Sequence, residues 1–143
     1  MSSRGLDILQ REVCDELLRT HEFGRIVTHI GDMPAAFPVF YTVIDGDIVF
    51  RTDPGTKLAA AALHSRVTFE IDDAVEAWSV MAVGFAEEVR RPDEIDRALD
   101  ALARYWAPGE RQRVIRITPG RVTGRRLRMP THTGTAAESG GQP

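Results

Sequence analysis

The chain has 143 residues, of which 43% are hydrophobic and 27% are charged, and its formal net charge is −3 at pH 7. This size and balance predict one soluble globular domain, and the acidic net charge argues against a nucleic-acid-binding protein, which would carry a basic face. No apolar run is long enough to span a bilayer, and the N-terminal residues lack the apolar core of a secretory signal, so we expect a cytoplasmic protein.

The first predicted element is a helix over residues 6–20. Its apolar side chains follow helical spacing, at Leu6, Leu9, Val13, Leu17 and Leu18. Cys14, the only cysteine, falls on the apolar side of this helix. A single cysteine excludes an intramolecular disulfide and a cysteine-rich metal site, so we interpret it as a buried, inert thiol.

Three strands follow. The runs "GRIVTHI" and "AFPVFYTVI" are rich in β-branched and aromatic residues and are separated by "GDMPA", which predicts a hairpin. "DGD" at residues 45–47 predicts a sharper hairpin turn that leads into "IVFRT", so the third strand ends at Thr52. Next come a bend through Asp53, Pro54 and Gly55 and a short alanine-rich helix that begins at about Thr56.

The second half adds further strands around one long helix. "RVTFEID" alternates as a strand does, and "WSVMAVGFAEEV" predicts a long strand in which Gly84 marks a bulge or bend. "RPDEIDRALDALARYWAP" predicts a helix of about four turns, and "RQRVIRITP" and "RVTGRRL" complete the sheet. Alternation in this last stretch indicates solvent-facing arginines, with an anion- or RNA-binding patch as the alternative. We expect the small, polar residues of the C-terminal tail to be disordered.

Because the strands follow one another through hairpins, the pattern favours an antiparallel sheet or barrel with helices outside it and argues against a Rossmann fold. The count is about six strands, and the fold is mainly β with flanking helices. We place the domain at residues 1–129 and the tail at residues 130–143.

The bend before the short helix gathers hydrogen-bond donors. Arg51 offers a guanidinium, Lys57, the only lysine, an ammonium, and Thr52 and Thr56 offer hydroxyls, while Gly55 allows close approach of the backbone. A helix N-terminus adds unpaired N–H groups and partial positive charge, so the group predicts a phosphate site. The alternative is a capped helix with two solvated basic side chains.

These segments resemble the pyridoxamine 5′-phosphate oxidase-like family of FMN-binding split β-barrels. The resemblance covers residues 6–127 and depends on an ordered series: "GRI", "FPV-Y", "FRT-x-x-GTK", "VTFEID", "WSV-x-V-G-A-E-V" and "RITPGRVTGRR". It implies a six-stranded antiparallel split β-barrel and a homodimer with two flavin sites at the subunit interface.

The resemblance also implies site residues. Strand residues 37–42, among them Pro38, Val39, Phe40 and Tyr41, would lie along the isoalloxazine ring of FMN, chiefly through their backbone. The phosphate would be held by Arg51, Thr52, Thr56 and Lys57. Ser79, from the same or the other subunit, would reach the ring or ribityl chain, and Trp78 would line the pocket. Without the resemblance, the aromatic residues of "FPVFY" are interpreted as ordinary core and sheet surface.

We therefore expect an FMN-binding oxidoreductase that acts on a small molecule, with no assigned acid–base residue. The chain is shorter than true pyridoxamine phosphate oxidases and has no recognisable substrate-binding segment near its C-terminus, which argues against vitamin B6 oxidation. Two alternatives remain open: a reductase that uses a deazaflavin coenzyme, and a non-catalytic protein that binds flavin or haem. His29 and His64 are expected at the surface, although haem ligation by either stays open, and the acidic loop of Asp72, Asp73 and Glu76 is interpreted as a solvated turn rather than a metal site.

Overall fold

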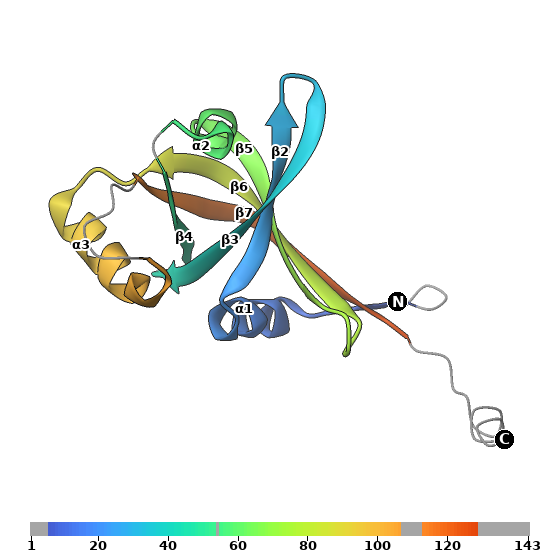
Figure 1. Cartoon of the computed structure of the whole chain (residues 1–143). Coiled ribbons are helices and arrows are strands. Elements are labelled where there is room, and N and C mark those ends of the chain that lie inside the picture. Colours follow the sequence, from blue (N-terminus) through green and yellow to red (C-terminus); the bar gives the residue numbers. More distant parts are fainter. Residues whose placement is uncertain (1–5, 54, 107–112, 129–143) are drawn as a thin grey trace, which may run out of the picture.

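The computed structural model of the protein describes residues 6–53, 55–106 and 113–128. Within these ranges, one antiparallel sheet is flanked by short helices (Figure 1). In chain order the elements are β1 (Leu6–Ile8), α1 (Arg11–Thr20), β2 (Phe23–Ile30), β3 (Met33–Ile44), β4 (Asp47–Thr52), α2 (Lys57–Ala62), β5 (Ser65–Asp73), β6 (Trp78–Glu88), α3 (Pro92–Ala101), the 3-10 turn η1 (Ala103–Tyr105) and β7 (Arg113–Leu127).

The six long strands form a closed ring. Their order is β7-β4-β3-β2-β5-β6, and β6 pairs again with β7. The short β1 adds a seventh strand on β7 only. This architecture confirms the predicted fold class, mainly β with flanking helices, and the predicted strand segments fall in β2–β7.

Three element boundaries differ from the sequence expectation. The first helix begins at Arg11 rather than residue 6, because Leu6–Ile8 pair with residues 125–127 of β7. The two predicted final strands are one continuous strand, β7. The predicted helix of about four turns is shorter than expected, because α3 ends at Ala101 and the chain continues as the separate 3-10 turn η1. The predicted tail at residues 130–143 lies outside the described residues.

Both predicted hairpins are present. Asp45 and Gly46 have φ values of 52° and 85°, as the tight turn between β3 and β4 requires. The turn between β2 and β3 is shorter than "GDMPA", since it contains only Gly31 and Asp32, and Met33 already pairs with Ile30.

Gly84 lies at a bulge, as predicted. The register between β6 and β7 shifts between Val83 and Gly84, and Gly84 lies opposite Pro119. A Cβ atom at Gly84 would lie 2.1 Å from the carbonyl oxygen of Thr118. Only glycine therefore allows the two strands to approach this closely.

The core fills the ring. Its largest fully buried side chains include Tyr41, Phe50 and Phe69. Cys14 of α1 is also fully buried, and burial raises the pKa of its thiol, in agreement with an inert cysteine.

A second apolar cluster lies between α3 and the outer faces of β4 and β7. It comprises Val49, Val89, Ala98, Leu102 and Val114. The helix starts favourably, with Pro92 at its first position and Asp93 and Glu94 in its first turn. This packing places η1 and Trp106 against the ring. In the ranges that the structure describes, no helix has the length and apolarity to cross a membrane.

Candidate functional site

The turn between β4 and α2 is held together by two threonine hydroxyls. Thr56 is the N-cap of α2, and its Oγ1 accepts a hydrogen bond of 3.1 Å from the backbone N–H of Ala59. The same oxygen lies 3.0 Å from Oγ1 of Thr52. One hydrogen bond between two hydroxyls uses one of their two protons, so the other remains available to a ligand.

Two basic side chains flank these hydroxyls. Arg51 is only 8% exposed, and its guanidinium carbon lies 4.8 Å from the centroid of the Trp106 ring, a cation–π arrangement. Lys57 is the first residue of α2 and is exposed, and within the described ranges it makes no ion pair. The four predicted phosphate-binding residues therefore lie together at the end of β4 and the start of α2.

The strand β3 presents different faces at the predicted cofactor residues. The side chains of Val39 and Tyr41 point into the core, and the Tyr41 hydroxyl donates a hydrogen bond of 2.7 Å to the carbonyl oxygen of Leu18. Burial, followed by the influence of Tyr105, raises the pKa of Tyr41. Pro38 and Phe40 are exposed on the opposite face. Any contact of a ligand with Tyr41 would therefore involve its backbone.

One edge of β3 is open over the described residues. Residues 33–40 pair with β2, whereas pairing with β4 begins only at Tyr41. Pro34 and Pro38 lie in this one-sided stretch, as suits a residue that has no N–H to donate to a second ladder. The edge leaves backbone polar groups that a planar ligand could use.

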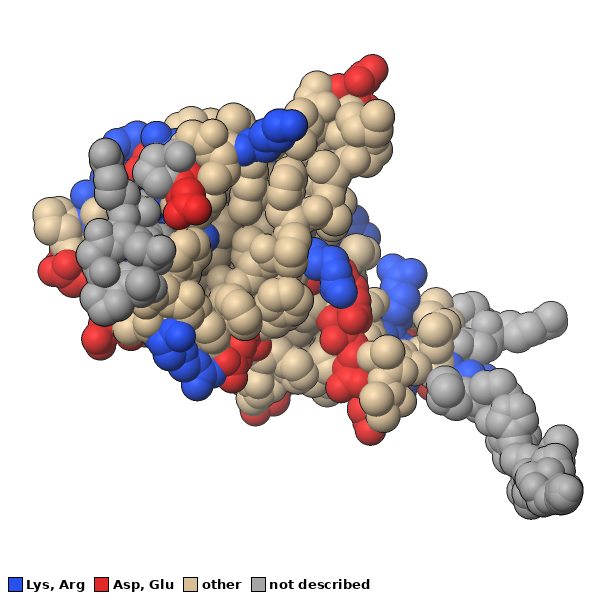
Figure 2. Space-filling view, viewed as in Figure 1, with Lys and Arg blue, Asp and Glu red and all other residues tan. Residues whose placement is uncertain are grey.

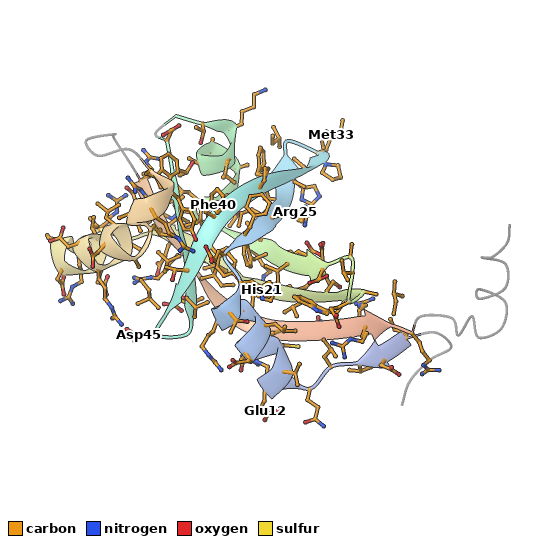
Figure 3. All side chains as sticks on the ribbon, turned by 60° about the horizontal axis from the view of Figure 1, so that its bottom comes forward. Glu12, His21, Arg25, Met33, Phe40 and Asp45 are labelled. Carbon is orange, nitrogen blue, oxygen red and sulfur yellow. The ribbon has the colours of Figure 1, made fainter. Side chains whose placement is uncertain are left out.

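Aromatic rings cover the outer face beside this edge. Phe40 stacks on Tyr105 of η1, with ring centroids 4.2 Å apart and an angle of 7° between the ring planes. The ring of Phe23 contacts Phe40 edge-on, with 5.1 Å between the ring centroids. Figure 3 shows Phe40 on β3 between the hairpin tip at Met33 and the turn at Asp45. The consecutive residues Tyr105 and Trp106 thus cover Phe40 and Arg51 on neighbouring strands.

Trp78 and Ser79 lie elsewhere in the chain. They begin β6, opposite Asp73 and Asp72 at the far end of β5, whereas α2 precedes the start of β5 (Figure 1). Seven residues of strand separate Ser65 from Asp72, which corresponds to roughly 23 Å. Within one chain, Ser79 and Lys57 are therefore at opposite ends of the sheet.

The two residues line a separate hollow of about 460 Å³ on the outer face of β5, β6 and β7. Trp78 is almost fully buried and meets the ring of His21 edge-on at 5.0 Å. Across β7, Arg125 lies directly opposite Ser79 and lines the same hollow.

A family comparison places the whole chain. The sequence model described as pyridoxamine 5′-phosphate oxidase matches residues 10–126, which include all of these residues. The chain belongs to the pyridoxamine 5′-phosphate oxidase family.

Three similar proteins match most of the chain. The uncharacterized protein Rv0080 of Mycobacterium tuberculosis is 31% identical over 92% of this chain and 92% of its own length. The FAD binding protein from Mycobacterium smegmatis is 35% identical, with a TM-score of 0.78 over 87% of this chain and 100% of that chain. The conserved protein DIP1874 from Corynebacterium diphtheriae is 30% identical, with a TM-score of 0.75 over 86% of this chain and 98% of that chain.

Two residues of the candidate site were not predicted from the sequence. Trp106 stacks on Arg51, and Arg125 lines the hollow with Ser79, yet both are distant from these partners in the sequence. The only local signal for Trp106 was its aromatic neighbour Tyr105 just before Pro108. Arg125 had none, because alternation alone placed it among solvent-facing arginines.

The remaining candidates are not brought together. His29 is exposed near the tip of the β2–β3 hairpin, and His64 is exposed after α2 with a φ of 62°. Asp73 accepts hydrogen bonds from the N–H groups of Val75 and Glu76, as expected for a solvated turn. Over residues 6–53, 55–106 and 113–128, no group of three His, Cys, Asp or Glu side chains could hold a metal ion.

Proposed function

We propose that the protein is a homodimeric flavoprotein that binds FMN and uses it for two-electron redox chemistry on a small molecule. In this proposal the phosphate lies at the turn between β4 and α2, where Arg51, Thr52, Thr56 and Lys57 hold it. The ring lies along the open edge of β3, at Pro38, Val39 and Phe40, and ends beside the backbone of Tyr41, where pairing with β4 begins.

The donor set at the turn carries the proposal. All four side chains can donate hydrogen bonds, two of them are cationic, and the Lys57 ammonium makes no ion pair with a carboxylate in the described ranges. A phosphate dianion needs such a set of donors, and charge-assisted hydrogen bonds to it are among the stronger ones in proteins. The residues present therefore fit a flavin phosphate.

The separation of the two residue groups supports a dimer. One flavin cannot contact both Lys57 and Ser79 of the same chain if the strand between their ends is roughly 23 Å long. We infer that Trp78 and Ser79 complete the cofactor site of the second chain. Exposed apolar side chains on the β2–β3 hairpin include Val27, Met33 and Phe40, and a second chain could cover them. Figure 2 shows few charged side chains on the face of the molecule around this hairpin.

Bound flavin would supply the hydride-transfer chemistry, and the chain's residues would bind and orient it. The stack of Phe40 and Tyr105 would exclude water on one side of the site. We assign no residue to proton transfer.

FAD is a second candidate cofactor, because the relative from Mycobacterium smegmatis that is 35% identical is an FAD binding protein. FAD contains the same ring, ribityl chain and first phosphate. A deazaflavin coenzyme is a third candidate. Arg121 and Arg125 lie on one face of β7 and make no ion pair within the described ranges, so they could receive its acidic tail.

The test is the visible spectrum of the gently purified protein, with mass spectrometry of the released ligand and light scattering for the mass of the assembly. We expect a flavin spectrum, FMN in the extract, one FMN per chain and the mass of a dimer. FAD or a deazaflavin would replace the cofactor assignment. A colourless protein that also fails to bind added FMN, FAD and deazaflavin would overturn the proposal.

A further inference from the structure

The hollow on the outer face of β5, β6 and β7 has the composition of a small-molecule site. Its volume of about 460 Å³ lies within the range of such sites, roughly 300–1,000 Å³. Apolar groups from Ala74, Ala77, Trp78 and Leu127 form much of its lining. The polar groups are few and come from Glu70, Asp72 and Asp73 on one side and from Ser79 and Arg125 on the other.

The carboxylates in this lining already have partners. Arg25 of β2 donates hydrogen bonds of 3.0 Å to Glu70 and 3.1 Å to Asp72. Asp73 accepts hydrogen bonds from two backbone N–H groups in the turn that follows. Figure 3 shows Arg25 on β2, the strand that pairs with β5. The carboxylates on this side of the hollow are therefore hydrogen-bonded without a cationic ligand.

Arg125 is the exception. Its side chain makes no ion pair or hydrogen bond with any residue of the described ranges, and the residue lies opposite Ser79 in a regular part of the β6–β7 ladder. Directly opposite residues on an antiparallel pair have Cβ atoms about 5 Å apart on the same face. A guanidinium and a hydroxyl at this spacing can bind one carboxylate between them.

We propose that this hollow binds a small apolar carboxylic acid, with its carboxylate on Arg125 and Ser79 and its apolar body against Ala77 and Leu127. The inference extends the proposed function, since such an acid would be the substrate class presented to a cofactor at the same two-chain site. Binding of the acid itself requires only the hollow.

The charge of Glu70 supports this ligand class. Burial, followed by the hydrogen bond and charge of Asp72, raises the pKa of Glu70 to about 7, against the opposing effect of Arg25. Near neutral pH this carboxyl is therefore protonated in about half of the molecules. The other charged groups around the hollow are Arg25 and Arg125, which are positive, and Asp72 and Asp73, which are negative, so their formal charges cancel when Glu70 holds its proton.

The experiment is calorimetric titration of the full chain with 2-naphthoate and, separately, with the uncharged 2-naphthamide. We expect 2-naphthoate to bind at least tenfold more tightly than the amide. Arg125→Gln should weaken 2-naphthoate binding about tenfold or more and leave amide binding unchanged. The matched control is Arg126→Gln, which removes the same charge from the neighbouring residue on the other face of β7.

The inference is overturned if Arg125→Gln binds 2-naphthoate as tightly as the parent protein, or if the amide binds as tightly as the acid. Titrations are repeated with saturating FMN. If 2-naphthoate still binds, the hollow is supported as a substrate site beside the cofactor. If 2-naphthoate and FMN displace each other, the assignment of the hollow as a substrate site is overturned. A protein that binds 2-naphthoate through Arg125 but no flavin would contradict the proposed function and leave the anion site standing.

Discussion

The side-chain oxygens of Thr52 and Thr56 lie 3.0 Å apart, so the last residue of β4 and the N-cap of α2 are joined by one hydrogen bond. Oγ1 of Thr56 also accepts a hydrogen bond from the backbone N–H of Ala59. A single hydroxyl thus closes the turn, caps the helix and can still contribute to a ligand site.

Replacement of this hydroxyl should affect stability and binding together. Thr56→Val removes the cap, and we expect the free energy of unfolding to fall by about 1 kcal/mol in urea denaturation. FMN affinity should fall as well. Thr56→Ser keeps the hydroxyl and serves as the control; a serine variant as impaired as the valine variant would contradict the role of the oxygen.

Lys57 should act on binding alone. Its side chain is exposed, so Lys57→Ala should leave the thermal unfolding midpoint unchanged. Loss of a charge-assisted phosphate contact should cost about 1.5–3 kcal/mol of FMN binding energy, measured by titration. Arg66→Ala, which removes another exposed cation at the start of β5, should bind FMN normally. An unchanged affinity for Lys57→Ala would show that the phosphate lies elsewhere.

Glu70 should make the stability of the folded protein depend on pH. Because its folded-state pKa is raised from 4.5 to about 7, the folded state holds a proton that the unfolded state has lost between these values. The free energy of unfolding should therefore fall as pH rises from about 4.5 to 7. Glu70→Gln should lack this component of the decline. Parallel urea-denaturation profiles of the two proteins over this range would refute the assignment.

Gly84 and Gly120 provide a matched pair of glycines at the β6–β7 pairing. A Cβ atom at Gly84 would lie 2.1 Å from a backbone oxygen, whereas at Gly120 the nearest atom would be 3.8 Å away. Gly84→Ala should lower the free energy of unfolding by about 1–3 kcal/mol through overpacking. Gly120→Ala should be close to neutral. Equal effects of the two substitutions would indicate that β7 can shift away from the bulge.

Local patterns were sufficient to predict most strands. The hairpin of β3 and β4 follows from alternating apolar residues and the Asp-Gly turn, all of which are neighbours in the sequence. β1 could not be predicted, because three residues show no period and become a strand only through pairing with β7.

The continuity of β7 also depends on its partner. Pro119 and Gly120 were interpreted as a break between two strands, but Pro119 lies opposite the bulge at Gly84. The bulge accommodates a residue that has no N–H to donate, so the strand continues.

The candidate site was likewise predicted only in part. Thr52, Thr56 and Lys57 are close in sequence, and the strand-to-helix turn was enough to group them. Trp106 and Arg125 reach the site only through the packing of α3 and the register of β7, which a single sequence does not specify.

β7 pairs with β1, β4 and β6, and it is the last described element of the chain. During synthesis on the ribosome, one edge of β4 and one edge of β6 therefore remain unpaired until β7 emerges. Exposed strand edges invite pairing with other chains, so this interval is the period of greatest aggregation risk. A premature stop codon before residue 113 would leave an open sheet that carries the turn between β4 and α2 but lacks the strand that closes the ring.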